Sequence, residues 1–225
     1  MTFSIIGYCQ RTGMQGVAIT TSSICVGSRC PRVRSGVGAV TSQNVTDPRI
    51  GNEILDLLSS GSTVADAVYE VMHDRPYAAY RQVAAVDNEG STSHFTGSNI
   101  LGVHNVSDGK DCVAAGNLLN NKDVPSAMAK QFEKGGDYHL AERLLLSLEA
   151  GILAGGEVGP THSAALLVAH ETPWPLVDLR VDWSTQPVID VRTCWTEYEP
   201  QMLDYVVRAL DPLSAPAYGV PGDPK

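Results

Sequence analysis

Apolar and polar positions alternate with two different periods along the chain, and each period predicts one type of element. Short runs rich in β-branched and aromatic residues, bounded by turn residues, predict strands, whereas apolar residues three or four positions apart predict amphipathic helices. Strands are expected at residues 2–9, 14–21, 36–43, 81–86, 91–96, 113–117, 163–169 and 176–182. Helices are expected after Asp47, after Ser62 or Thr63, and at residues 125–132, 139–153 and 187–210.

The order of these elements favours one fold class. Blocks of strands alternate with pairs of helices, with turns at 10–13 and 87–90 and a polar loop at 22–35. This order predicts two packed antiparallel sheets flanked by helix layers, an α+β sandwich rather than a doubly wound parallel sheet. Residues 1–210 are expected to form one domain. Residues 211–225, which hold four of the thirteen prolines, are expected to be an irregular tail.

Composition narrows the functional classes. The 225 residues include 16 Lys and Arg against 25 Asp and Glu, a net charge of −9, and only 6% are aromatic. A nucleic-acid binder needs a basic face and stacking aromatics, so this class is disfavoured. No apolar run approaches the roughly 20 residues that span a bilayer, and no basic and apolar leader opens the chain. We therefore expect a cytoplasmic protein that binds neither nucleic acid nor membrane.

Cysteines and cofactor motifs add little chemistry. The chain has five cysteines without a repeating spacing, at positions 9, 25, 30, 112 and 194. Cys25 and Cys30 have no second pair to complete a zinc site, and reduced, packed thiols are expected. A Walker loop, a dinucleotide fingerprint and an HExxH motif are all absent from the sequence. The sequence therefore predicts neither a cofactor nor a metal.

The start of the chain offers a nucleophile. Removal of Met1 before the small Thr2 would leave a hydroxyl and a free α-amine on one residue. An α-amine has a pKa of about 7.7 to 8.0, so it can accept the hydroxyl proton near neutral pH. Many proteins begin with Met-Thr and have no such chemistry, so the dipeptide alone decides nothing.

Six short sequence blocks, which follow one another in order along the chain, make the prediction of Thr2 as a nucleophile more specific. They are residues 1–5, 36–43, 116–119, 154–157, 163–168 and 177–182. With these blocks the chain resembles a bacterial and archaeal family catalogued as domain of unknown function 1028. The resemblance runs from residue 1 to about residue 190, most of the chain.

The resemblance implies a fold and a chemistry. The family is grouped with the N-terminal-nucleophile (Ntn) hydrolases, which share a four-layer αββα sandwich and hydrolyse C–N bonds with an N-terminal Thr, Ser or Cys. Residues 1–210 would then be one Ntn-hydrolase-like domain with Thr2 as nucleophile. The chain departs from the family where Glu157 follows two glycines, since Gly-Gly-Asp is usual, and where His162 precedes Ser163, since Gln-Ser is usual. Substrate contacts in this loop are expected to differ from those of the family.

An acyl-transfer site also needs hydrogen-bond donors for the oxyanion. Asn44 and Asn117 are the candidate side-chain donors, and Gly116 would let a backbone N–H approach the same atom. Gln43 is a candidate for orienting the substrate amide. Each asparagine could equally be a turn or strand-end residue bonded to nearby backbone, and Gln43 could simply close a buried strand end.

Charged residues and a histidine complete the candidate site. Arg29, Arg32 and Arg34 cluster in the 22–35 loop, and Arg29 or Arg34 could clamp a substrate carboxylate. The alternative is a solvated loop whose charges aid solubility. Glu157 and His162 are candidate substrate contacts, and an imidazole with a pKa near 6.5 suits proton transfer, although an Ntn site does not require one.

Three functions stay open at this point. The first is an Ntn-type amidohydrolase that opens a small amide or cyclic amide with Thr2, using Asn44 and Asn117. The second is a non-catalytic small-molecule-binding protein on the same fold. The third is a hydrolase that uses Cys25 or Ser22 instead of Thr2. In each case a homodimer or a higher homo-oligomer is expected, because two-sheet domains with large helical faces often pair.

Overall fold

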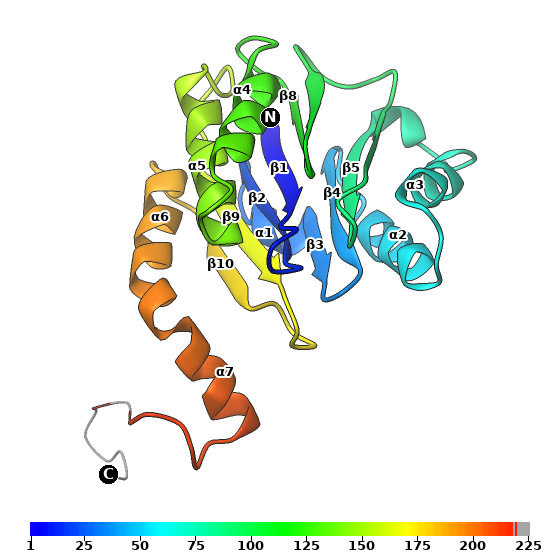
Figure 1. Ribbon diagram of the computed structural model, residues 1–225. Coiled ribbons are helices and arrows are strands. Elements are labelled where there is room, and N and C mark those ends of the chain that lie inside the picture. Colours follow the sequence, from blue (N-terminus) through cyan, green and yellow to red (C-terminus); the bar gives the residue numbers. More distant parts are fainter. Residues whose placement is uncertain (218, 220–225) are drawn as a thin grey trace.

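The computed structural model describes residues 1–217 and residue 219, and its ten strands form two antiparallel sheets (Figure 1). The larger sheet has the order β10-β9-β2-β1-β8-β7 and the smaller sheet the order β3-β4-β5-β6. The strands of the larger sheet are β1 (Thr2–Tyr8), β2 (Gln15–Thr21), β7 (Asn105–Gly109), β8 (Cys112–Asn117), β9 (Ser163–Ala169) and β10 (Val177–Val181). Those of the smaller sheet are β3 (Pro31–Arg34), β4 (Gly38–Asn44), β5 (Arg81–Asp87) and β6 (Thr92–Thr96).

Helices cover the outer face of each sheet. The α-helices are α1 (Val26–Arg29), α2 (Arg49–Ser59), α3 (Val64–Met72), α4 (Val124–Lys134), α5 (Leu140–Leu153), α6 (Pro187–Tyr198) and α7 (Met202–Leu210). Helices α4, α5 and α6 pack on the larger sheet, and α2 and α3 on the smaller one (Figure 1). The predicted α+β sandwich with two antiparallel sheets between helix layers is confirmed, and its four layers follow the order αββα.

Alternation along β1 explains how one strand serves two apolar layers. Phe3 and Ile5 belong to the core between the larger sheet and its helices. Ile6 belongs to the core between the two sheets. Because successive side chains point to opposite faces, Thr2 and Ser4 also face the smaller sheet. The larger sheet is therefore buried on both faces, and polar residues on its inner face lie between the sheets.

Turns and caps were the most predictable local features. Gly13, with a φ of 74°, closes the β1–β2 turn by donating its N–H to the carbonyl of Cys9 at 2.8 Å. Thr63 caps α3, because its hydroxyl accepts the N–H of Asp66 at 3.1 Å. The predicted hairpin turn after Asp87 is also present, with the Asp87 N–H donating to Ser91.

Elsewhere the structure differs from the sequence-based expectation. The segment 22–35 is not a loop throughout, because it holds the short helix α1 and the edge strand β3, which begins at Pro31. Proline and arginine are typical of an edge strand, but they lack the apolar run that signals a buried one. The predicted helix 187–210 is interrupted by a 3-10 turn at Glu199–Gln201. Pro200 has no N–H to donate, so the α-helical ladder breaks there.

The predicted tail is only partly described. Residues 211–217 contain turns and no helix or strand, and α7 before them extends away from the sandwich (Figure 1). Residue 218 and residues 220–225 lie outside the described residues. Within the described residues, no helix combines the length and apolarity needed to cross a membrane.

Candidate functional site

Four polar residues form a row across one end of the larger sheet. Thr2 pairs with Thr21 on β2 and with Asn117 on β8, and Thr21 pairs in turn with Ser163 on β9. Residues in register across a sheet share a face, so all four side chains lie on the inner face of the sheet. Each of the four is buried, with Thr2 only 6% exposed. The row Ser163–Thr21–Thr2–Asn117 is the geometric centre of the candidate site.

A buried polar network lies between the sheets beside this row. The hydroxyl of Ser4 donates to Gln43 at 2.8 Å, and Gln43 donates to Oε1 of Gln82 at 2.8 Å. The same Oε1 accepts from Nδ2 of Asn117 at 3.2 Å, and Gln82 donates to the carbonyl of Gly116 at 3.1 Å. These bonds join the two sheets and hold the Asn117 side chain in place. Asn117 Oδ1 is buried with no hydrogen-bond partner in the described part of the chain.

The first peptide bond lies within the row. The carbonyl of Met1 accepts from the Thr2 hydroxyl at 2.6 Å and also from the Thr21 hydroxyl. The two threonine hydroxyls are 3.0 Å apart. Removal of Met1 would therefore free both hydroxyls and leave the new α-amine of Thr2 inside the site. The Thr21 hydroxyl would then be the neighbour that orients the hydroxyl of Thr2.

Glu157 approaches the row from a loop that glycine makes possible. Gly155 and Gly156, with φ of 120° and 57°, turn the chain sharply after α5. Glu157 then forms a bridge with Leu119, just beyond the end of β8. Its side chain is 7% exposed, and neither carboxyl oxygen has a hydrogen-bond partner among the described residues. An acid buried without partners is costly, so its position calls for a functional explanation.

The surroundings of Glu157 shift its ionisation. Burial raises the pKa of Glu157 to about 8, and the charge of the N-terminal amine of Met1 opposes that rise. The backbone N–H of Ser22 faces the carboxyl and opposes the rise more weakly, without completing a hydrogen bond. The N-terminal amine is thus close enough for its charge to act on the carboxyl. Perturbed acids of this kind cluster at functional sites.

The comparisons with known proteins identify the family of the chain. The model of a family of unknown function, DUF1028, matches residues 2–191. The chain belongs to the DUF1028 family. A crystal structure of a DUF1028 protein from Silicibacter pomeroyi is 33% identical, with a TM-score of 0.83, and the match covers 91% of this chain and 89% of that one.

More distant comparisons add no function. Anbu (ancestral beta-subunit) from Yersinia bercovieri is 11% identical, with a TM-score of 0.37, over 90% of this chain and 97% of that one. No curated protein matches this DUF1028 chain. The family is therefore established for this chain, and its chemistry has to be argued from the site.

The two predicted asparagines have different surroundings. Asn117 lies in the row, next to Thr2. Asn44 ends β4 with a φ of 70°, donates to the carbonyl of Tyr80 at 2.8 Å and accepts the N–H of Leu101 at 3.2 Å. Those bonds match the alternative expected from the sequence, a strand-end asparagine that holds nearby backbone. The structure brings Asn117, Gln43 and Gly116 together with Thr2, whereas the side chain of Asn44 is occupied by the loop.

The arginines of the 22–35 segment are separated from one another. Arg29 donates to the Ser23 hydroxyl at 2.5 Å and to the Cys25 carbonyl at 2.9 Å, so it braces the loop that follows Thr21. Arg34 lies at the far end of β3 and forms an ion pair with Asp56 at 2.8 Å. Arg29 is thus beside the site as a loop brace, and Arg34 is on the α2 side of the smaller sheet.

His162 lies directly before the row, and its contacts hold it in the loop. Its backbone N–H donates to the carbonyl of Thr21 at 2.7 Å, and the ring Nδ1 is 3.0 Å from the carbonyl oxygen of Ser184. The ring stacks on Trp183, with 4.4 Å between the ring centroids. Because Nδ1 faces a carbonyl oxygen, it carries the proton, which leaves Nε2 as the basic nitrogen in neutral histidine.

The alternative nucleophiles Ser22 and Cys25, and the neighbouring Ser23, have surroundings that suit nucleophilic attack less well than those of Thr2. Ser23 accepts from Arg29 and is exposed, and its hydroxyl is 3.3 Å from that of Thr21. Cys25 occupies the N-cap position of the short helix α1 with a φ of 58°, and its side chain forms no cap hydrogen bond. The backbone N–H of Ser22 faces the Glu157 carboxyl. None of these three residues belongs to the row.

Sequence reasoning missed Thr21, Ser163 and Gln82. The first could have been found, because a hairpin closed by the turn at 10–13 places residue 21 opposite residue 2. Ser163 accepts the N–H of Val26 and donates to the carbonyl of Ser23, so it ties the loop to the sheet. Its position and that of Gln82 depend on pairing between distant strands, for which local sequence carries no signal.

Proposed function

We propose that the protein, once Met1 is removed, is an Ntn-type amidohydrolase that opens the C–N bond of a small amide or cyclic amide with Thr2. One observation carries this proposal. The Thr2 hydroxyl lies 3.0 Å from the Thr21 hydroxyl in a buried row, and the unpartnered Glu157 carboxyl lies beside the N-terminal amine. The N-terminal threonine, Thr21 on β2 and Glu157 from the loop after α5 therefore converge from three separate segments of the chain.

The chemistry balances with these groups alone. Thr2 Oγ1 attacks the amide carbonyl while its proton passes to the α-amine of Thr2, directly or through a water. The same proton then goes to the leaving nitrogen as the C–N bond breaks, which leaves an acyl ester on Thr2. Water attacks the ester and returns a proton to the oxygen of Thr2. The products are a carboxylic acid and an amine, or a single opened chain if the substrate is cyclic.

Glu157 and Asn117 have supporting roles in this proposal. The Glu157 carboxyl lies close enough to the N-terminal amine for the charge of that amine to lower the pKa of the carboxyl. Asn117 has an unpartnered Oδ1 that can accept from the mature amine. Its Nδ2 already donates once to Gln82, which leaves one N–H for the oxyanion. Gly116 remains the candidate for a backbone donor.

The proposal is tested by pairing intact-mass measurement with an amide and lactam screen. Thr2→Ala is expected to lower turnover at least about a thousandfold while leaving the fold intact. Thr2→Ser is expected to keep part of the activity, because the hydroxyl and the amine both survive. Thr96→Ala, which changes an exposed threonine on β6, is the matched control.

Two results would overturn the proposal. The first is full activity in a preparation that mass spectrometry shows to retain Met1, because the amine would then be locked in a peptide bond. The second is equal activity of the Thr2→Ala and Thr96→Ala variants. A pH–rate profile adds an independent test, since the rate is expected to rise with pH as the amine loses its proton, near or below about pH 8.

A further inference from the structure

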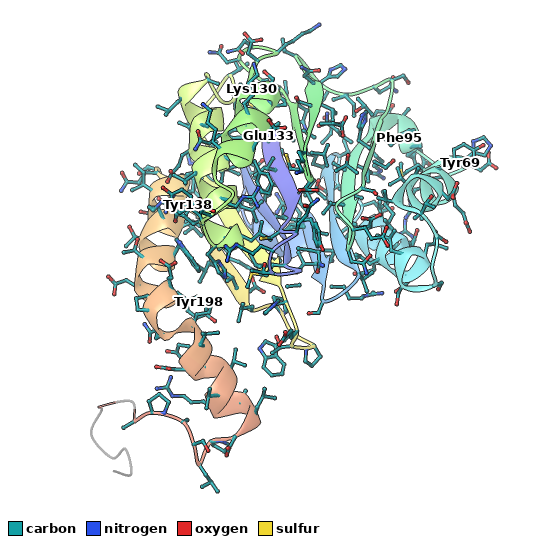
Figure 2. All side chains as sticks on the ribbon, in the orientation of Figure 1. Tyr69, Phe95, Lys130, Glu133, Tyr138 and Tyr198 are labelled. Atoms are coloured by element: carbon teal, nitrogen blue, oxygen red, sulfur yellow. The ribbon has the colours of Figure 1, made fainter. Side chains whose placement is uncertain are left out.

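A polar cavity lies at the end of β1 opposite Thr2. It has a volume of about 460 Å³ and is lined by Cys9, Gln10, Arg11, Lys110, Asp111, Glu133, Gly136 and Arg143. Cys9 follows Thr2 by seven residues along an extended strand, which places the two ends of β1 about 20 Å apart. Glu133 lies near the C-terminal end of α4 (Figure 2). This cavity is therefore separate from the row around Thr2.

Arg143 lines the cavity and has no acidic partner among the described residues. It is the only buried arginine of the described residues, with 7% of its surface exposed, and no ion pair involves it. Its Nε–H has no hydrogen-bond partner in the described part of the chain. The paired arginines of the fold are less buried; Arg75 and Arg192, for example, each contact two carboxylates. A buried guanidinium without a carboxylate is costly unless an anion completes it.

The Arg143 head group is held in one orientation. Its central carbon lies 3.9 Å from the centroid of the Phe132 ring, and Nη2 donates to the Phe132 carbonyl at 3.2 Å. One face and one nitrogen of the guanidinium are therefore occupied by α4. A guanidinium fixed in this way loses little entropy when it binds a planar acceptor.

The cavity as a whole, including Arg143, carries a net charge that suits an anion with a single negative charge. Three cations, Arg11, Lys110 and Arg143, line it together with two acids, Asp111 and Glu133, so that the net charge is +1 in a chain of net charge −9. Phosphate carries nearly two negative charges near neutral pH, and the two acids would repel it. A carboxylate carries one, and the cavity is large enough for a small organic molecule.

We propose that this cavity is a second binding site, which takes the carboxylate of a small molecule on Arg143. Lys110 and Arg11 add positive charge at the exposed rim, and the two acids select against more highly charged anions. The direction of the pKa shift of Cys9, which lines the same cavity, supports binding of a negative group there. Burial raises the pKa of the Cys9 thiol, but hydrogen bonds with Thr12 and the charge of Arg143 outweigh burial and lower it overall. The site thus favours negative charge.

The test follows the Nε–H signal of Arg143 by NMR while acetate is titrated into the protein. Phosphate and chloride are titrated separately at matched ionic strength for comparison. Acetate is expected to shift this signal in a saturable manner. Binding is expected to weaken at least about tenfold in Arg143→Gln, the loss expected for a hydrogen bond to a charged group, and is then followed through neighbouring amide signals. Arg180→Gln, which removes an exposed arginine paired with Asp178, is the matched control and is expected to bind acetate as the wild type does.

Two rim variants keep the test independent of core packing. Lys110→Gln is expected to weaken acetate binding, because it removes a positive charge at the exposed rim. Glu133→Gln is expected to strengthen it, because it removes repulsion while its amide oxygen can still accept the Lys110 backbone N–H. The proposal is overturned if acetate causes no saturable shift, if phosphate binds more tightly than acetate, or if the two rim variants change binding in the same direction.

Discussion

Replacement of Glu157 by glutamine is expected to stabilise the protein at neutral pH while impairing the proposed activity. The carboxyl is 7% exposed and has no hydrogen-bond partner in the described residues, and burial raises its pKa to about 8 from an ordinary value of 4.5. Glutamine has the size of a protonated glutamic acid and never ionises. The substitution therefore removes the cost of keeping this acid in its folded environment.

The magnitude follows from linkage between folding and protonation. Between pH 4.5 and pH 8 the folded state holds a proton on Glu157 that the unfolded state has lost, so the free energy of unfolding falls as pH rises. Each pH unit is worth about 1.4 kcal/mol. At pH 7 the accumulated cost is about 3 kcal/mol, and below pH 4.5 it disappears. Glu157→Gln is thus expected to gain up to about 3 kcal/mol at pH 7 and almost nothing at pH 4.

Urea unfolding at a series of pH values measures this difference. The wild type and Glu157→Gln are expected to converge at acidic pH and to separate progressively up to about pH 8. Glu70→Gln, a change of an exposed glutamate on α3, controls for the loss of one negative charge. A constant difference between wild type and variant across the pH range, or a less stable variant at pH 7, would refute the assignment of Glu157 as an uncompensated buried acid.

Other substitutions probe other parts of the fold. Asp47→Asn is expected to destabilise the protein by about 3 kcal/mol in urea unfolding, because it removes the charge of a buried carboxylate that forms ion pairs with Arg49 and Arg75. Hydrogen bonds from Arg49, followed by those from Arg75, hold the pKa of Asp47 well below its usual range, so its stabilisation is complete above about pH 4 and is lost on acidification. Gly7→Ala is expected to cost about 2 kcal/mol in thermal unfolding, since the new methyl group would clash with the Phe132 ring. Thr63→Ala is expected to cost about 1 kcal/mol through loss of the α3 cap, measured by helical circular dichroism during unfolding.

Local sequence determined the elements that have a local cause. The apolar stripes of α2, α3 and α5, the turn at Gly13 and the cap at Thr63 depend on residues within one or two turns of each other. The alternation of strand blocks and helix pairs was enough to predict two antiparallel sheets between helices. Local signals failed for β3 and β7, whose residues are half-exposed and carry no continuous apolar run.

The candidate site divides in the same way. Thr2 was predicted as a nucleophile from its position after Met1 together with the family resemblance, and its pairing with Thr21 follows from one hairpin turn. Asn117 and Ser163 reach the same row only because β8 and β9 pair beside that hairpin, across more than a hundred residues of chain. Such pairings depend on burial of two sheet faces at once, which no local window of sequence records.

Only the tertiary structure determines which charged residues are buried and which of them lack hydrogen-bond partners. In the sequence, Arg143 is one of 41 charged residues with nothing to distinguish it, and Glu157 is marked only by its departure from the family pattern, which does not reveal its burial. The glycine turn after α5 carries Glu157 under the row, and the contact with Phe132 holds Arg143 below a polar cavity. Their chemistry comes from exclusion of water and from the hydrogen-bond partners missing at the Glu157 carboxyl and at Nε of Arg143, and only the packed fold determines both.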